Sequence, residues 1–156
     1  MSEATIRPAT ASDLPAIQSV VNDAYSRYIP RMGRPPAPMS ADYADLVARG
    51  AAWVLVQDGG VAGLIVLRAN EDGLLVSNVA VSSAHQGRGL GRRLLDHAEA
   101  HARQNGIDEL RLYTHVLMHE NVAIYTRLGW QEYDRAEQDG FNRIFMRKRL
   151  PPAATA

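Results

Sequence analysis

Three glycines alternate with larger residues in the segment Gln86-Gly87-Arg88-Gly89-Leu90-Gly91, directly after the apolar run Val79-Ala80-Val81. Glycine permits backbone conformations in which successive N–H groups converge on one anion. The residues that follow have helical spacing, and a helix N-terminus adds a partial positive charge to such a site. This segment therefore predicts a binding site for a phosphorylated ligand.

Other glycine-rich loops that bind nucleotides fit this segment less well. A dinucleotide fingerprint needs G-x-G-x-x-G, but after Gly87 and Gly89 the third glycine position holds Arg92. A P-loop needs Lys directly after its last glycine, but Gly91 is followed by Arg92. The remaining alternative is a turn that binds nothing, yet such closely spaced glycines carry an entropic cost that a plain turn does not need.

Two motifs resemble those of the GNAT family of N-acetyltransferases. The first is the glycine-rich segment itself, which matches the family's Q/R-x-x-G-x-G/A loop. The second is Tyr125-Thr126-Arg127-Leu128-Gly129-Trp130, which is similar to a later helix of the family. In relatives the loop binds the pyrophosphate of acyl-CoA, and the preceding strand bonds the pantetheine arm through its main chain. The resemblance therefore implies that acetyl-CoA contacts Val79, Ala80, Val81, Gln86, Gly87, Arg88, Gly89, Leu90, Gly91, Arg92 and Asn121.

The order of the predicted elements extends this resemblance over almost the whole chain of 156 residues. It implies an α/β fold with a mixed, mostly antiparallel sheet of about six to seven strands and about four flanking helices, splayed between two parallel strands. The length favours a single domain. We place that domain at residues 1–150 and expect a disordered tail at residues 151–156.

Local patterns predict where the elements lie. Asp58-Gly59-Gly60 predicts a hairpin turn between two apolar strands. Thr10 and Asp13 predict a capping arrangement at the first helix. Several prolines predict an irregular loop at residues 29–39. Further along, we expect strands at residues 74–81, 110–114, 131–136 and 142–147, and helices at residues 89–104 and 120–128.

Tyr125 is the candidate general acid. Amide formation from a thioester needs aligned reactants, a neutral amine and a proton for the leaving thiolate. By resemblance, Tyr125 occupies the position of the family's Tyr near the CoA sulfur, and a phenol with a pKa of about 10 can donate that proton. The alternative is that Tyr125 only packs with its apolar helical neighbours Val122 and Leu128.

The chain departs from the family's pattern at two positions. Many relatives carry a Glu as general base on the strand before the loop, where this chain has Ser77. Deprotonation would then use ordered water or another acid such as Glu120. Many relatives also place an Asn seven residues before the Tyr, where this chain has Met118, and Asn121 comes four residues before Tyr125.

The acceptor site is implied by the resemblance to lie beside the loop between the first two helices. In that loop Tyr28, Arg31 and Arg34 supply aromatic and charged groups for recognition, and His115 is expected where the two parallel strands diverge. Two guanidinium groups favour an acceptor that carries a carboxylate or phosphate, and they disfavour a polycation. The alternative is a surface loop whose Tyr side chains anchor it to the core.

Composition excludes several classes of function. Basic and acidic residues number 17 each, so the formal net charge is zero, which argues against a general nucleic-acid or membrane binder. The chain has no Cys, which excludes disulfides and thiolate catalysis. His97 and His101 have metal-ligand spacing but no convincing third ligand, so we expect no metal site. The start lacks a leader pattern, so we expect a cytoplasmic protein.

These observations together predict an acetyl-CoA-dependent N-acetyltransferase. We expect direct transfer to the primary amine of a small molecule in a ternary complex, because no Cys can carry the acyl group. One alternative is a non-catalytic acyl-CoA binding or sensor module, which the missing Glu at Ser77 keeps open. Another is a protein N-terminal or lysine acetyltransferase. Relatives often dimerise, so a homodimer is compatible with this prediction.

Overall fold

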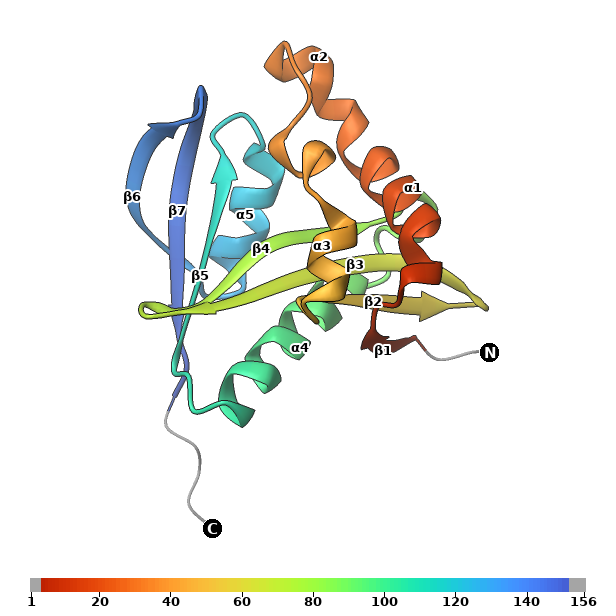
Figure 1. Ribbon diagram of the computed structural model, residues 1–156. Coiled ribbons are helices and arrows are strands. Elements are labelled where there is room, and N and C mark those ends of the chain that lie inside the picture. Colours follow the sequence, from red (N-terminus) through yellow and green to blue (C-terminus); the bar gives the residue numbers. More distant parts are fainter. Residues whose placement is uncertain (1–3, 152–156) are drawn as a thin grey trace. The chain divides into compact units, whose positions relative to one another are not determined.

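The structure is a computed structural model that describes residues 4–151 (Figure 1). The helices are α1 (Leu14–Tyr25), α2 (Ile29–Met32), α3 (Tyr43–Ala48), α4 (Leu90–Gln104) and α5 (His119–Arg127). The strands are β1 (Thr5–Pro8), β2 (Ala52–Gln57), β3 (Gly60–Asn70), β4 (Gly73–Val81), β5 (Glu109–His115), β6 (Gln131–Gln138) and β7 (Phe141–Arg149). Of the tail predicted at residues 151–156, residues 152–156 lie outside the described part.

Within the described residues the strands form one seven-stranded sheet in the order β1-β2-β3-β4-β5-β7-β6. The pairs β1–β2, β2–β3, β5–β7 and β6–β7 are antiparallel, whereas β4 and β5 are parallel. The parallel register runs from Leu74 opposite Leu110 to Val76 opposite Leu112, although both strands continue further. The predicted mixed sheet with a partly paired parallel strand pair is therefore confirmed.

A glycine is required where β4 and β5 begin to pair. Gly73 has a φ of 139°, which L side chains rarely adopt. A Cβ added at Gly73 would lie 2.3 Å from the carbonyl oxygen of Glu109. Gly73 thus permits a close approach of two backbones.

The chain forms two compact units. The first comprises Met1–Leu67 and Asn78–Ala98, and the second comprises Arg68–Ser77 and Glu99–Ala156. Strands β3 and β4 and helix α4 each contribute residues to both units. The single domain at residues 1–150 stays a prediction.

In the first unit, helices pack on both faces of the strands. Helix α1 contacts α3, and α3 contacts β2; Figure 1 shows α1 and α3 in front of β2 and β3. Asn78 of β4 bonds to Tyr25 of α1, whereas Val81, on the opposite face, lies beside Gly91 of α4. Alternation along β4 therefore separates an α1-facing side from an α4-facing side.

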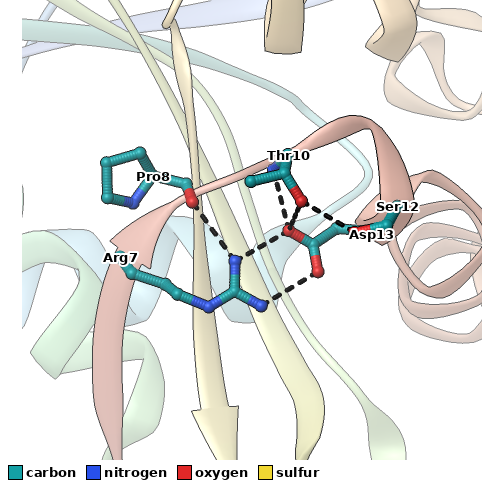
Figure 2. A network of polar contacts seen from close by, with 5 residues as sticks. All are labelled: Arg7, Pro8, Thr10, Ser12 and Asp13. Carbon is teal, nitrogen blue, oxygen red and sulfur yellow. Dashed lines mark hydrogen bonds and ion pairs between the residues drawn. The ribbon is translucent and has the colours of Figure 1, made fainter.

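The 3₁₀ turn Ala11–Asp13, directly before α1, is held by an ion pair and a cap, as Figure 2 shows. The guanidinium of Arg7 in β1 donates to both carboxylate oxygens of Asp13, at 2.8 and 3.0 Å. The amide of Thr10 donates to the same carboxylate at 2.8 Å, which confirms the predicted capping arrangement. The hydrogen bonds from Arg7, supported by Thr10, hold the pKa of Asp13 well below its usual range.

In the second unit, one sheet face is apolar and covered by helices. Leu112 of β5 and Met146 of β7 are buried, and α5 contacts β5. On the same face of β7 as Met146, Lys148 forms an ion pair of 2.9 Å with Glu99 of α4. Both helices therefore pack on the face that carries the apolar residues.

The segment at residues 29–39 was expected to be irregular, and that prediction is wrong. It contains α2 and, at Ala37–Ser40, a 3₁₀ turn. Pro30 lies in the first turn of α2, where its missing N–H has no intrahelical acceptor to lose. Gly33 ends α2 with a left-handed φ of 77°. Proline can start a helix, so its presence alone does not exclude one.

Candidate active site

The glycine loop, residues 86–92, follows β4 in the first unit and includes the first residues of α4. Gly87 has a φ of 82° and Gly89 a φ of 75°, both in the left-handed region. A Cβ added at either position would meet no atom of the described chain within 4 Å. Backbone conformation, and not lack of room, therefore requires glycine at these positions.

The amides of this loop form a row of donors. Among residues 4–151, no backbone or side-chain oxygen accepts a hydrogen bond from the amides of residues 87–92. The first bond of α4 runs from the amide of Arg93 to the carbonyl of Gly89, at 3.1 Å. The helix dipole adds positive potential at the same place. The loop can therefore hold an anion such as a pyrophosphate.

Side chains hold the segment that precedes the loop. Asp23 of α1 accepts hydrogen bonds from the amide of Ser83 and from its hydroxyl, the latter at 2.9 Å. Gln86 Nε2 donates to the carbonyl of Val81 at 3.1 Å, so this side chain turns back onto the end of β4. Arg88 and Arg92 are exposed. Contact of these residues with a cofactor stays a prediction.

A buried polar network supports the C-terminal half of β4. The hydroxyl of Tyr25 lies 2.6 Å from Oδ1 of Asn78 and 2.9 Å from the carbonyl oxygen of Val79. Asn78 Nδ2 donates to the hydroxyl of Tyr43 at 2.7 Å, and that hydroxyl donates to the carbonyl of Pro38. This network joins α1, α3 and the turn at residues 37–40 to the strand that is expected to bind pantetheine.

Sequence reasoning missed Tyr25, Asn78 and Tyr43. All three are buried, and burial raises the pKa of the Tyr43 phenol above its usual range. One signal in the sequence could have indicated the network: Asn78 places a polar amide side chain in an otherwise apolar strand, and a buried polar side chain needs hydrogen-bond partners. Its two tyrosine partners lie 53 and 35 residues away, and local patterns do not identify such distant contacts.

The predicted acceptor residues of the first unit have different surroundings. Tyr28 is 1% exposed, and its ring lies under two guanidinium groups, with Arg27 at 4.8 Å and Arg31 at 5.3 Å. Arg27 also donates to the Tyr28 hydroxyl at 2.7 Å. Arg31 and Arg34 are exposed. Tyr28 therefore holds cations in place, and its direct contact with substrate stays a prediction.

The remaining predicted site residues lie in the second unit. Tyr125 on α5 is half-buried, and its ring centroid lies 6.0 Å from that of Trp130. The amide of Trp130 donates to the carbonyl of Tyr125, which fixes the end of α5. The Tyr-x-x-Leu-Gly-Trp motif thus has a structural role, and the role of the Tyr125 hydroxyl as an acid stays a prediction.

Two polar residues flank the start of α5. Asn121 Nδ2 lies 3.7 Å from the sulfur of Met118. His115, at the end of β5, accepts a hydrogen bond at Nδ1 from the amide of Leu117 at 3.1 Å. That contact assigns the proton of a neutral His115 ring to Nε2. The ring also meets Phe141 edge-on, with centroids 6.0 Å apart.

No base emerges on β4 from the described geometry. Ser77 is half-buried, and the amide of Asn78 has no basic nitrogen at neutral pH.

Among residues 4–151, no three His, Asp or Glu side chains form a group that could hold a metal. In the same residues, no helix combines the length and apolar character needed to cross a membrane.

Comparisons with known proteins identify the family. The model of the Acetyltransferase (GNAT) family matches residues 16–130. N-alpha-acetyltransferase 80 of Mus musculus is 40% identical over 82 residues, which are 53% of this chain and 24% of that protein. N-acetyltransferase family 8 member 3 of Rattus norvegicus is 29% identical over 86 residues, which are 51% of this chain and 38% of that protein. The matched part thus spans well under half the length of these curated relatives.

Solved structures share the fold. The ribosomal-protein-S18-alanine N-acetyltransferase of Escherichia coli has a TM-score of 0.76 at 24% identity, with 97% of both chains covered. PaiA N-acetyltransferase from Thermoplasma acidophilum, solved with coenzyme A, has a TM-score of 0.77 at 18% identity, covering 96% of this chain and all of that one. Since the family match covers well over half of the sequence, the chain belongs to the GNAT family of acetyltransferases.

Proposed function

We propose that the chain is an acetyl-CoA-dependent N-acetyltransferase that transfers the acetyl group directly to a primary amine in a ternary complex. The observation that carries this proposal is the row of amides at residues 87–92, which have no acceptor among the described residues and are shaped by Gly87 and Gly89. Family membership supports the same activity. Acetyl-CoA supplies the thioester whose acetyl group the amine takes up.

We assign the following roles in binding and catalysis to residues of the chain. The amides of residues 87–91 hold the pyrophosphate, and Arg88 and Arg92 add charge beside it. The main chain of residues 79–81 bonds the pantetheine arm, while Tyr25 steadies that strand through Val79. Tyr125 donates a proton to the leaving thiolate. The amine must be neutral when it reacts, and water is our candidate for taking up its proton.

We further propose that the acceptor is a small cytoplasmic amine that also carries an acidic group. Arg31 and Arg34 are exposed in the segment at residues 29–39, which we expect to border the acceptor site, and the Tyr28 ring lies under the Arg31 guanidinium. Guanidinium groups bind carboxylates bidentately and repel polycations. Comparing an amino acid with its amide as substrates tests this: the free acid should have the higher kcat/KM, and Arg31→Ala should reduce that preference.

A second acceptor class is supported by the relatives. One of them is named as an N-alpha-acetyltransferase, and one structural neighbour is described as acting on the alanine of a ribosomal protein. The second candidate function is therefore acetylation of a polypeptide N-terminus. A short peptide with a free N-terminus should then outperform the corresponding free amino acid in kcat/KM.

Acetyl-CoA binding tests the proposal directly. A ligand that binds only the folded state stabilises it by about 2.7 kcal/mol at a hundredfold excess over its Kd. Gly89→Val should abolish this stabilisation, because valine does not adopt the left-handed conformation that aims the amides. The matched control is Gly59→Val, at a hairpin turn with a φ of 81° and equally open surroundings.

The control separates strain from binding. Both variants should lose stability without ligand, but only Gly89→Val should lose the response to acetyl-CoA. If Gly89→Val folds and binds acetyl-CoA as the wild type does, the pyrophosphate site lies elsewhere. If the wild type binds acetyl-CoA but releases no CoA with any amine, the chain is a binding module.

A further inference from the structure

The second unit carries a stripe of arginine and aromatic side chains that no step above uses. The rings of Tyr113 and Phe145 lie 6.0 Å apart, and those of Tyr133 and Phe145 lie 6.3 Å apart. Three guanidinium groups accompany these rings. We define the Arg–aromatic stripe by Arg111 and Tyr113 of β5, Tyr133 of β6, and Arg143, Phe145 and Arg147 of β7.

The stripe lies on the sheet face opposite the core of its unit. On β5, Arg111 and Tyr113 alternate with the buried Leu110 and Leu112. On β7, the stripe residues alternate in the same way with the buried Ile144 and Met146. Tyr133 is 39% exposed, and the other stripe residues are half-buried. The stripe is therefore accessible along its length.

Aromatic rings hold the guanidinium groups in place. The Arg143 guanidinium lies 4.3 Å from the centroid of the Tyr113 ring. Arg111 and Arg147 lie 5.2 and 5.6 Å from the centroid of the Tyr133 ring. Such contacts restrict a flexible side chain and leave the in-plane N–H groups available as donors. The stripe therefore presents preorganised cations.

Two of these cations lack a carboxylate partner. Arg111 pairs with Glu109 at 2.6 Å. Among the described residues, however, neither Arg143 nor Arg147 forms an ion pair, and Arg143 donates only to the neutral amide of Gln138. The whole chain has no net charge, so this positive excess is local.

We propose that the Arg–aromatic stripe is a docking surface for an acidic, extended segment of a partner polypeptide. Arg143 and Arg147 stand four residues apart on one face of β7, roughly 13 Å along the strand. Glu or Asp side chains four residues apart in an extended segment have the same spacing, and each can meet one guanidinium bidentately. A nucleic acid fits less well, because guanidinium groups already occupy ring faces on which bases would stack.

Direct binding tests this proposal without catalysis. The probe is a fluorescent Ser/Thr-rich peptide with Glu at every fourth position, compared with its Gln analogue by anisotropy on the full chain. Wild type should prefer the Glu peptide, and the preference should weaken with salt. The double variant Arg143→Gln/Arg147→Gln should weaken binding about fivefold or more. The double variant Arg93→Gln/Arg103→Gln, an equal charge change on exposed α4, should bind as the wild type does.

A charge-neutral variant separates the stripe from simple attraction. Tyr133→Leu removes the ring that holds Arg111 and Arg147 but changes no charge, and it should still weaken binding about threefold. Circular dichroism and melting should show that every variant folds. Equal binding of the Glu and Gln peptides overturns the proposal, as does an equal loss in Arg93→Gln/Arg103→Gln. Tighter binding of an oligothymidylate than of the Glu peptide also overturns it.

Discussion

The glycine loop follows β4, the strand whose Asn78 belongs to the Tyr25–Asn78–Tyr43 network, and the two regions have opposite character. The amides of residues 87–92 in the loop have no acceptor among the described residues, and most of the loop is exposed. In the network, both tyrosine hydroxyls and both polar atoms of Asn78 are hydrogen-bonded and buried. Unsatisfied exposed donors are free to bind a ligand, whereas satisfied buried groups hold the strand that positions them.

This contrast has a measurable consequence. A change in the loop should reduce ligand binding more than a network change does, since the loop's amides gain partners only from ligand or water. A change in the network should reduce the free energy of unfolding, since it removes hydrogen bonds between buried polar groups. Tyr125 shares features of both the exposed loop and the buried network, because it is half-buried and its ring packs near Trp130.

The largest effect is expected at Tyr125. If its hydroxyl protonates the leaving thiolate, Tyr125→Phe should lower kcat by about 10²–10⁴-fold. KM for acetyl-CoA should change much less, because the ring and its packing remain. Thr126→Val removes a hydroxyl from the same helix and should leave kcat within about twofold of the wild type. An unchanged kcat in a chemistry-limited assay would place Tyr125 with the purely structural residues.

The next largest effect is expected at Asn78. Asn78→Ala removes the buried hydrogen bonds that Asn78 forms with the Tyr25 and Tyr43 hydroxyls, so the free energy of unfolding should fall by about 2–3 kcal/mol. Urea denaturation measures this. Asn22→Ala is the matched control: the Asn22 side chain is exposed on α1 and, among residues 4–151, bonds to exposed Gln18 alone, so its loss should cost at most about 0.5 kcal/mol. Equal losses in the two variants would contradict the network's role.

The sequence predicted best those features that depend on local conformation. The glycine loop, the hairpin turn at Asp58 and Gly59, and the capping arrangement of Thr10 with Asp13 each involve residues close together in the chain. Left-handed backbone and short side-chain caps impose strong residue preferences, so local patterns carry this information.

Features that depend on register or long-range packing could not be predicted in the same way. The partners of Asn78 come from two helices far along the chain. The Arg–aromatic stripe depends on which residues of β5, β6 and β7 stand opposite one another, including a bulge between Glu132 and Asp134. Alternating residues show which side chains share a face of one strand, but not which strand comes next to it.

The smallest effect is expected at a second satisfied network, where Arg7 and Thr10 bond to Asp13 (Figure 2). Asp13→Asn removes the charge that this bidentate contact uses, so unfolding at pH 7 should become easier by about 1–2 kcal/mol. The control is Glu132→Gln, which breaks an exposed pair with Arg135 and should change stability little because solvent screens it.

The pH dependence of the free energy of unfolding tests the Asp13 prediction more specifically. Because Arg7 holds the pKa of Asp13 below its unfolded value of about 3.9, the folded state favours the charged carboxylate. The resulting stability is fully present above about pH 4 to 5 and is lost as the pH falls further toward the folded pKa. The difference between wild type and Asp13→Asn should therefore be constant near neutrality and shrink in acid. A difference that stays the same down to pH 2.5, or one that grows, would show that the ion pair does not favour the charged carboxylate.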